Sequence, residues 1–237
     1  MNDIETEISI RDIHKYWIQR TVAVVHCGAH LAEELEEYVN VEWKEVTWIE
    51  ANPDLIPRLK ARIKDSNLSK ILIAALWSID GEELELKVAS NSYSSSFLNF
   101  GSHAKTYPDV NFKKVIKVKS VTLNSLFQSH EIRNGGLLVL DLQGGELEAL
   151  KGATNILNHF DYIYTEVSKG NLYESQGKWK EITNFLTSQN FKLADWQYSE
   201  KLNWGNALYQ RNGKLLNILK TRFRRKIHHR YSHKVNQ

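Results

Sequence analysis

The sequence contains little cysteine, proline or glycine. Among its 237 residues are one Cys, three Pro and twelve Gly. The one cysteine, Cys27, cannot form an intramolecular disulfide, which excludes a disulfide-stapled fold and predicts a reducing compartment. The composition of 42% hydrophobic and 25% charged residues excludes collagen-like and disordered chains, and indicates a globular protein.

Long apolar runs are also absent. No such run approaches the roughly 18 residues that span a bilayer. The first residues, MNDIETEISIRD, are acidic and lead into no apolar stretch, so they do not have the pattern of a signal peptide. These features predict a cytoplasmic protein.

Acidic residues are missing from the last part of the sequence. The segment from Asn212 to Gln237 has eight Lys or Arg and no Asp or Glu. Residues 1–211 have 23 basic and 28 acidic residues, so the net charge of +3 combines an acidic body with a basic tail. An apolar stripe recurs there at helical spacing, at Leu216, Leu219, Phe223 and Ile227. A basic amphipathic helix of this kind can lie on an anionic membrane surface. A disordered tail, or a helix docked on its own domain, would also fit this pattern.

Short apolar segments alternate with helical patterns along the body. We expect strands near residues 22–27, 46–50, 71–76, 83–88, 114–119, 137–142, 162–167, 192–197 and 207–211. A helix is expected from about His30, with Val39 on its buried face. Strands separated by helices predict an α/β fold with a mostly parallel sheet, and the closing pair is expected to be antiparallel. The division expected is an N-terminal helical segment (1–21), one domain (22–211) and a basic tail (212–237).

Polar residues follow several of the expected strands, where open α/β sheets bind their ligands. The first of these turns reads VVHCGAHLAEE, in which Gly28 lets a ligand approach the backbone closely. A dinucleotide fingerprint would need further glycines, but the corresponding places hold His30 and Glu33, and Glu33 would repel a phosphate. The turn therefore fits a ligand without a pyrophosphate, or is an ordinary strand-to-helix turn.

A second signal is Glu50, which ends an expected strand 22 residues after Gly28. An acid at this place can accept hydrogen bonds from both ribose hydroxyls. Together with the missing phosphate site, it favours a nucleoside ligand such as S-adenosylmethionine. The alternative is a solvated carboxylate at a strand end.

Several motifs, in order, resemble the FkbM family of S-adenosylmethionine-dependent methyltransferases. The most specific is LLVLDLQGGELEALKGA at residues 137–153, and the others are WIEANPDLIPRL, ALWSIDGEELEL, SNSYSSSFLNFG, YTEVSKGNLYE and NWGNALYQR. The resemblance extends from about Val22 to Arg211. It implies a doubly wound, mostly parallel seven-stranded sheet with helices on both faces, the Rossmann-like class I methyltransferase fold, with an antiparallel strand near the C-terminal end.

The resemblance also implies which residues bind the cofactor. Gly28, Ala29 and His30 would form the turn around the methionine portion. Glu50 would bind the ribose, with Ala51 and Asn52 beside it, and Ala75 and Leu76 would lie against the adenine. Three positions depart from the family pattern. His26 replaces an acid, His30 an asparagine and Ala32 a glycine.

Three carboxylates are the catalytic candidates: Asp141, Glu166 and Glu146. Asp141 and Glu166 end strands that should be neighbours, so their side chains could converge on one cleft. One carboxylate, preferably Asp141, could act as a general base toward a hydroxyl. Alternatively the group could hold a divalent cation that lowers the pKa of the hydroxyl, although the residues do not specify a metal site. Glu146 could also simply cap its helix.

The segment from Ala89 to Pro108 is expected to be a functional loop. Its serine-rich part, Asn91 to Ser96, with Tyr93, His103 and Tyr107 nearby, could cover the cleft and bind a polar substrate; a solvated loop is the alternative. We therefore expect an O-methyltransferase that acts on a small-molecule or carbohydrate-like hydroxyl, although the sequence does not decide between O and N. A non-catalytic binding or scaffold protein is the second hypothesis. Nucleic acid is disfavoured, because no Asn-Pro-Pro-Tyr type of motif is present.

Overall fold

A computed structural model describes residues 6–20, 22–43, 45–64, 69–127 and 135–213. No helix in these ranges is long and apolar enough to cross a membrane. The apolar stripe and all eight Lys and Arg residues of the predicted tail lie outside the described residues, so the proposed membrane contact stays a prediction from the sequence.

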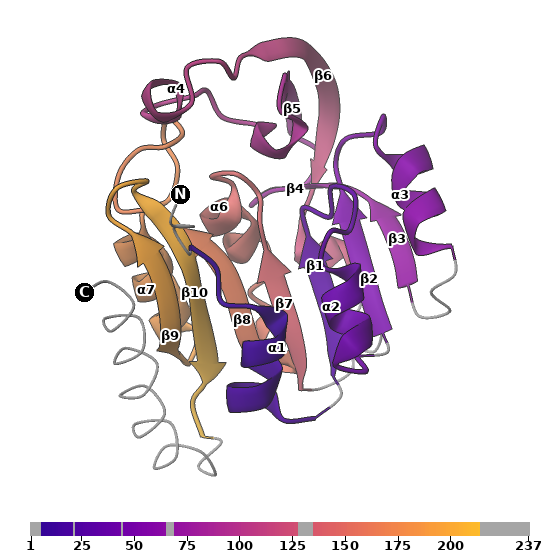
Figure 1. The fold of residues 1–237 in the computed structure, drawn as a ribbon, viewed down its shortest axis with the longest axis vertical. Coiled ribbons are helices and arrows are strands. Elements are labelled where there is room, and N and C mark those ends of the chain that lie inside the picture. The colour runs from indigo at the N-terminus through magenta and orange to yellow at the C-terminus, as the bar shows by residue number, and fades with distance from the viewer. Residues whose placement is uncertain (1–5, 21, 44, 65–68, 128–134, 214–237) are drawn as a thin grey trace, which may run out of the picture.

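A seven-stranded sheet in the order β3-β2-β1-β7-β8-β10-β9 forms the centre of the molecule (Figure 1). Its strands are β1 (Ala23–Cys27), β2 (Glu45–Glu50), β3 (Ser69–Ile73), β7 (Gly136–Leu140), β8 (Phe160–Val167), β9 (Phe191–Ser199) and β10 (Trp204–Arg211). The first five strands of this order are parallel, and β10 is antiparallel to both β8 and β9. This confirms the predicted fold class. The strand order reverses between β1 and β7, the place where such sheets bind ligands.

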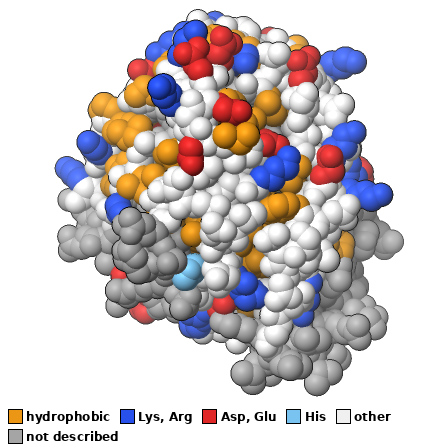
Figure 2. Space-filling view, turned by 180° about the vertical axis from the view of Figure 1, so that it is seen from behind, with side chains coloured by type: hydrophobic (Ala, Val, Ile, Leu, Met, Phe, Trp, Pro, Cys, Tyr) orange, Lys and Arg blue, Asp and Glu red, His pale blue; other side chains and the backbone are white. Residues whose placement is uncertain are grey.

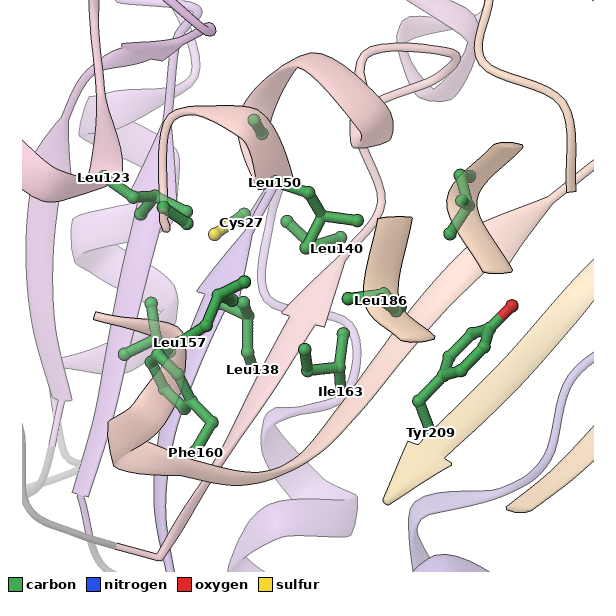
Figure 3. Close-up of a cluster of buried hydrophobic side chains, with 14 of the residues drawn as sticks. Cys27, Leu123, Leu138, Leu140, Leu150, Leu157, Phe160, Ile163, Leu186 and Tyr209 are labelled. Carbon is green, nitrogen blue, oxygen red and sulfur yellow. The ribbon is translucent and has the colours of Figure 1, made fainter. Parts of the chain in front are cut away.

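Helices cover both faces of the sheet, as expected (Figure 1). One face carries α1 (Ile10–Ile13), the π-helical turn η1 (His14–Ile18), α2 (Leu35–Asn40) and α3 (Ile56–Ile63). The other carries α5 (Leu123–Leu126), α6 (Glu146–Lys151), η3 (Leu157–His159) and α7 (Trp179–Ser188). Because successive side chains of a strand point to opposite faces, Leu137 and Val139 enter one core while Leu138 and Leu140 enter the other (Figure 3).

Two expected elements differ in the structure. The helix expected from His30 begins only at Leu35, because His30 and Ala32 have φ angles of 43° and 55°, which do not continue a right-handed helix. Val39, expected to be buried, is 53% exposed. The single strand expected at 71–76 is interrupted at Ala74, so that its two halves belong to different sheets.

The second half of that strand, β4 (Ala75–Leu76), belongs to a small three-stranded sheet. It pairs in parallel with β6 (Phe112–Val121), which pairs antiparallel with β5 (Glu83–Ala89). Between β5 and β6 run the short helices η2 (Ser92–Ser94) and α4 (His103–Thr106). Figure 1 shows that this segment lies beyond the carboxyl ends of β1 and β7. The expected functional loop therefore lies over the edge where a ligand would bind.

Candidate functional site

The turn after β1 packs closely against the turn after β7. Gly28 has a φ of +85°, and a Cβ at this position would lie 1.8 Å from the backbone oxygen of Asp141. The backbone N–H groups of Gly28 and Ala29 both donate to the carbonyl oxygen of Ile49, at 2.9 Å. Glycine is therefore required both by the backbone conformation and by the close approach of two chain segments.

The carboxylate of Glu50 lies at the end of β2 and is 8% exposed. Its Oε2 accepts from the backbone N–H of His30 at 2.8 Å, and its Oε1 from that of Asn52 at 2.7 Å. Burial raises the pKa of Glu50, and these backbone hydrogen bonds oppose the rise. A carboxylate has about four acceptor positions, so two are left for a ligand.

His30 connects this turn with the serine loop, which we define as Asn91–Ser96. Its Nδ1 lies 2.8 Å from Oε1 of Glu33, and its Nε2 lies 2.8 Å from Oγ of Ser92. The ring packs on that of Tyr93 with 4.3 Å between centroids, and the Tyr93 hydroxyl donates to Glu33. At the other end of the loop, the Ser96 hydroxyl donates to the backbone oxygen of Gln143 at 2.7 Å.

These turns and the serine loop enclose a cavity of about 670 Å³, open to solvent, which we call the turn cavity. It is lined by Gly28, His30, Ile49, Glu50, Ala51, Asn52, Leu55, Ala74, Leu76, Leu86, Ser92, Tyr93, Ser95, Ser96, Phe97, Asp141, Leu142 and Gln143. Six of the eight predicted cofactor residues are among them. Ala29 and Ala75 are not; both are buried behind the lining, at 1% and 3% exposure, and Ala74 takes the place expected for Ala75.

A hydrogen-bonded group of side chains follows β7. Gln143 donates from Nε2 to Oδ1 of Asp141 at 2.6 Å and to Oε2 of Glu166 at 3.2 Å, while its Oε1 accepts from the Tyr173 hydroxyl at 2.6 Å. The strands β7 and β8 are parallel neighbours, as expected, and bring the two carboxylates together. Asp141 opens onto the cavity, yet the surrounding protein desolvates its carboxylate and raises its pKa. Burial, and then Asp141, raise the pKa of Glu166 well above its usual range.

The third predicted carboxylate, Glu146, turns away from the cavity into the loop before α6. Its side chain is 3% exposed and accepts from the backbone N–H of Leu142 at 2.7 Å and of Gly144 at 3.1 Å. Burial raises its pKa to about 7. The geometry therefore assigns Glu146 to holding the loop that carries Asp141 and Gln143.

A second cavity of about 800 Å³, which we call the aromatic cavity, adjoins the first. It is lined by Glu7, Asn91, Tyr93, Ser94, His103, Tyr107, Asp141, Gln143, Glu166, Leu172, Tyr173, Trp204 and Asn206. Tyr93, Asp141 and Gln143 line both cavities, so these residues mark the junction between them. Tyr93, His103 and Tyr107, noted in the sequence as possible substrate contacts, all line the aromatic cavity.

Sequence reasoning missed four residues of this site. Gln143 lies inside the most specific motif. Its amide stands between two strand-end carboxylates, Asp141 and Glu166, and this position is the signal that could have identified it. Tyr173 lay within another quoted motif. Trp204 also lay within a quoted motif, NWGNALYQR, whereas Glu7 gave no local signal, because only the fold brings it to the cavity. In the described ranges, no group of three or more His, Cys, Asp or Glu is arranged to hold a metal ion.

Comparison with known proteins agrees with this architecture. In fold, the chain is similar to a TehB-like SAM-dependent methyltransferase from Corynebacterium glutamicum, with 11% identity, a TM-score of 0.50, and coverage of 89% of this chain and 90% of that one. A magnesium protoporphyrin IX methyltransferase from Synechocystis PCC 6803, solved with bound SAM, has 7% identity and a TM-score of 0.45 over 86% of this chain and 78% of that one.

No curated protein matches the sequence. A family model does match: residues 26–193, well over half of the chain, fit the Methyltransferase FkbM domain. The chain therefore belongs to the FkbM methyltransferase family.

Proposed function

We propose that this protein is an S-adenosylmethionine-dependent O-methyltransferase that acts on a hydroxyl of a small-molecule or carbohydrate-like acceptor. The observation that carries the proposal is the junction of two cavities at Tyr93, Asp141 and Gln143. A methyltransferase needs a cofactor site and an acceptor site that meet at the reacting atoms, and a carboxylate at the junction can take the proton of the acceptor.

The turn cavity suits S-adenosylmethionine in both polarity and shape. Glu50 has acceptor positions for the two ribose hydroxyls, and Ile49, Leu55 and Leu76 provide apolar walls for an adenine ring. Gly28 lets the turn after β1 pack against the backbone of Asp141, beside the place proposed for the methionine portion. When bound, S-adenosylmethionine supplies an electrophilic methyl group, whose bond to sulfur breaks with the electron pair left on sulfur.

Asp141 is the residue best placed to remove the hydroxyl proton. Gln143 binds its Oδ1, and no donor in the described part of the chain contacts Oδ2, which is therefore available to a substrate hydroxyl. A raised pKa brings a carboxylate closer to the working pH of a general base. Gln143, fixed by Tyr173, holds Asp141 and Glu166 in place, so we assign it a positioning role.

The acceptor would lie in the aromatic cavity. Asn91, Ser94 and Asn206 offer amide and hydroxyl groups, and Tyr107 and Trp204 offer flat apolar faces. This combination suits a sugar-like molecule, which has hydroxyls at its rim and C–H groups on its faces. A divalent cation is not needed for this assignment, since Asp141 can act as the base by itself.

Calorimetry with S-adenosylmethionine tests the cofactor site. The unaltered protein should bind it, and Glu50→Gln should bind it about tenfold to a hundredfold more weakly, because one ribose acceptor becomes a donor. Glu85→Gln, on the exposed surface of β5, removes the same charge away from the cavity and should bind normally. Absence of binding to the unaltered protein would contradict the proposal and favour a scaffold protein.

A further inference from the structure

The aromatic cavity is closed on one side by the N-terminal strap, which we define as residues 6–9. Figure 1 shows this segment running in front of β10 and β8 toward α1. The Asn206 side-chain amide donates to the backbone oxygen of Thr6 at 3.2 Å, and the backbone N–H of Ile8 donates to the Tyr164 hydroxyl at 2.9 Å. These contacts bring Glu7 to the cavity wall.

The N-terminal strap and β10 contribute residues that line the aromatic cavity and do not line the turn cavity. Glu7, Trp204 and Asn206 all lie outside residues 26–193, the range that fits the family model. Trp204 and Asn206 belong to the NWGNALYQR segment that resembles the family, whereas Glu7 lies before the resemblance begins, so Glu7 is the lining residue outside both ranges. Residues that line an acceptor cavity but not the cofactor cavity are suited to select the acceptor.

Among the described residues, the aromatic cavity is lined by acidic side chains and by no Lys or Arg. The acidic residues are Glu7, Asp141 and Glu166. Burial and then Asp141 raise the pKa of Glu7, and the same two causes raise that of Glu166. In contrast, basic and acidic side chains are mixed across the described surface on the back of the molecule (Figure 2). The single sign of charge in the cavity is thus not shared by this face of the molecule.

The positive sulfonium of a cofactor does not account for all three carboxylates. Asp141 lines both cavities and could face either ligand, whereas Glu7 and Glu166 line the aromatic cavity and not the turn cavity. In the described part of the chain, no hydrogen-bond donor or ion-pair partner contacts the Glu7 carboxylate. Glu7 is exposed to solvent at the edge of the aromatic cavity, so its carboxylate is accessible to a ligand there.

Aromatic rings provide a second, independent feature. Tyr93, Tyr107, Tyr173 and Trp204 line the same cavity, and the Trp204 indole N–H donates to the Tyr107 hydroxyl at 3.4 Å. The face of an aromatic ring attracts a cation, and the attraction grows as the pair is removed from water. Carboxylates and aromatic faces without any Lys or Arg form the chemical surroundings that favour an ammonium group.

We propose that the acceptor carries a protonated amine beside the hydroxyl that faces Asp141, and that Glu7 binds this amine. An amino sugar is the simplest molecule with both groups and with the C–H faces that Trp204 can contact. Bound there, the ammonium group offsets the repulsion between Glu7, Asp141 and Glu166. The inference rests on the proposed function, because it names the acceptor of that reaction.

Three hexoses that differ in charge test the inference: D-glucosamine, D-glucose and D-glucuronate. Each is titrated into the protein alone and into the protein saturated with S-adenosylhomocysteine. D-glucosamine should bind about tenfold more tightly than D-glucose, the gain expected of one charged hydrogen bond, and D-glucuronate should bind most weakly. Glu7→Gln should remove the preference for the amine without changing the affinity for S-adenosylhomocysteine, and Glu85→Gln should keep the preference.

Equal binding of D-glucose and D-glucosamine would overturn the inference. So would tighter binding of D-glucuronate, absence of D-glucosamine binding at tens of millimolar, or a preference that survives in Glu7→Gln. If Glu7→Gln does not fold, the three affinities of the unaltered protein still decide the outcome. If S-adenosylhomocysteine does not bind, the proposed function fails, and the titrations of the protein alone decide the charge preference separately.

Discussion

The imidazole of His30 lies 2.8 Å from the hydroxyl of Ser92, although 62 residues separate them in the sequence. His30 belongs to the turn after β1, whereas Ser92 belongs to the loop that covers the turn cavity. The family pattern has an asparagine at position 30, so on the sequence alone the histidine is a departure from the cofactor-binding pattern. In the structure, the His30 imidazole connects the serine loop, which covers the turn cavity, to the turn after β1.

His30→Asn should loosen this cover. Asparagine adopts a positive φ readily and keeps the backbone N–H that donates to Glu50, but it is too short to reach both Glu33 and Ser92. Loss of two hydrogen bonds should speed amide hydrogen exchange in the serine loop and weaken S-adenosylmethionine binding by about tenfold. Ser92→Ala, which removes one of the two, should have a smaller effect. Unchanged exchange in His30→Asn would show that the loop is held by other contacts.

Gly28→Ala should destabilise the protein far more than Gly81→Ala. The two glycines have nearly equal φ angles of +85° and +82°, but a Cβ at Gly81 would have no atom within 4 Å, whereas one at Gly28 would overlap the backbone of Asp141. The conformational cost of about 1–2 kcal/mol is common to both, so the difference in unfolding free energy measures the overlap. Urea unfolding of both variants provides the measurement. Equal destabilisation would mean that the turn can move away from β7.

Asp141→Asn should lower the rate of methyl transfer by about a hundredfold or more, the usual contribution of a general base, with little change in cofactor affinity. Glu146→Gln should lower the rate less, because Glu146 binds backbone N–H groups and lies outside both cavities. Formation of S-adenosylhomocysteine with D-glucosamine as acceptor provides the readout. An equal loss in both variants would make Glu146 a partner in proton transfer.

His26 should make the protein less stable in acid. Its ring is buried, with Nδ1 at 2.9 Å from the Tyr38 hydroxyl, and burial lowers its pKa from 6.5 to about 4. The unfolded chain therefore binds a proton between these pH values that the folded chain does not, and stability falls as the pH falls from 6.5 toward 4. Relative to His26→Phe, the unaltered protein should lose about 3 kcal/mol of unfolding free energy over this range.

Denaturant titrations of both proteins at each pH give the comparison. Groups such as Glu146, whose raised pKa has the opposite effect on stability, are present in both proteins and cancel in the difference. A difference that stays constant with pH would show that His26 titrates normally in the folded protein.

Much of the fold could be predicted from local patterns in the sequence. The segments that became β1 and β7 were identified because a strand that is buried on both faces is largely apolar, whatever its neighbours are. Six of the eight expected cofactor residues line the turn cavity, because they follow strands whose carboxyl ends must meet in a parallel sheet. The helix start at Leu35 and the break at Ala74 were not predicted, since backbone conformation and pairing partners at these points depend on distant segments.

The sequence by itself determined the class of the protein: an α/β chain with a glycine turn, a strand-end acid and the motifs of the FkbM family. These are properties of residues within a few positions of one another, and local periodicity and spacing record them. Only the tertiary structure decided which side chains line the aromatic cavity, because Glu7 and Trp204 lie almost two hundred positions apart and both reach it through the strap and β10. Which side chains line a cavity depends on strand order and register, which no local pattern specifies.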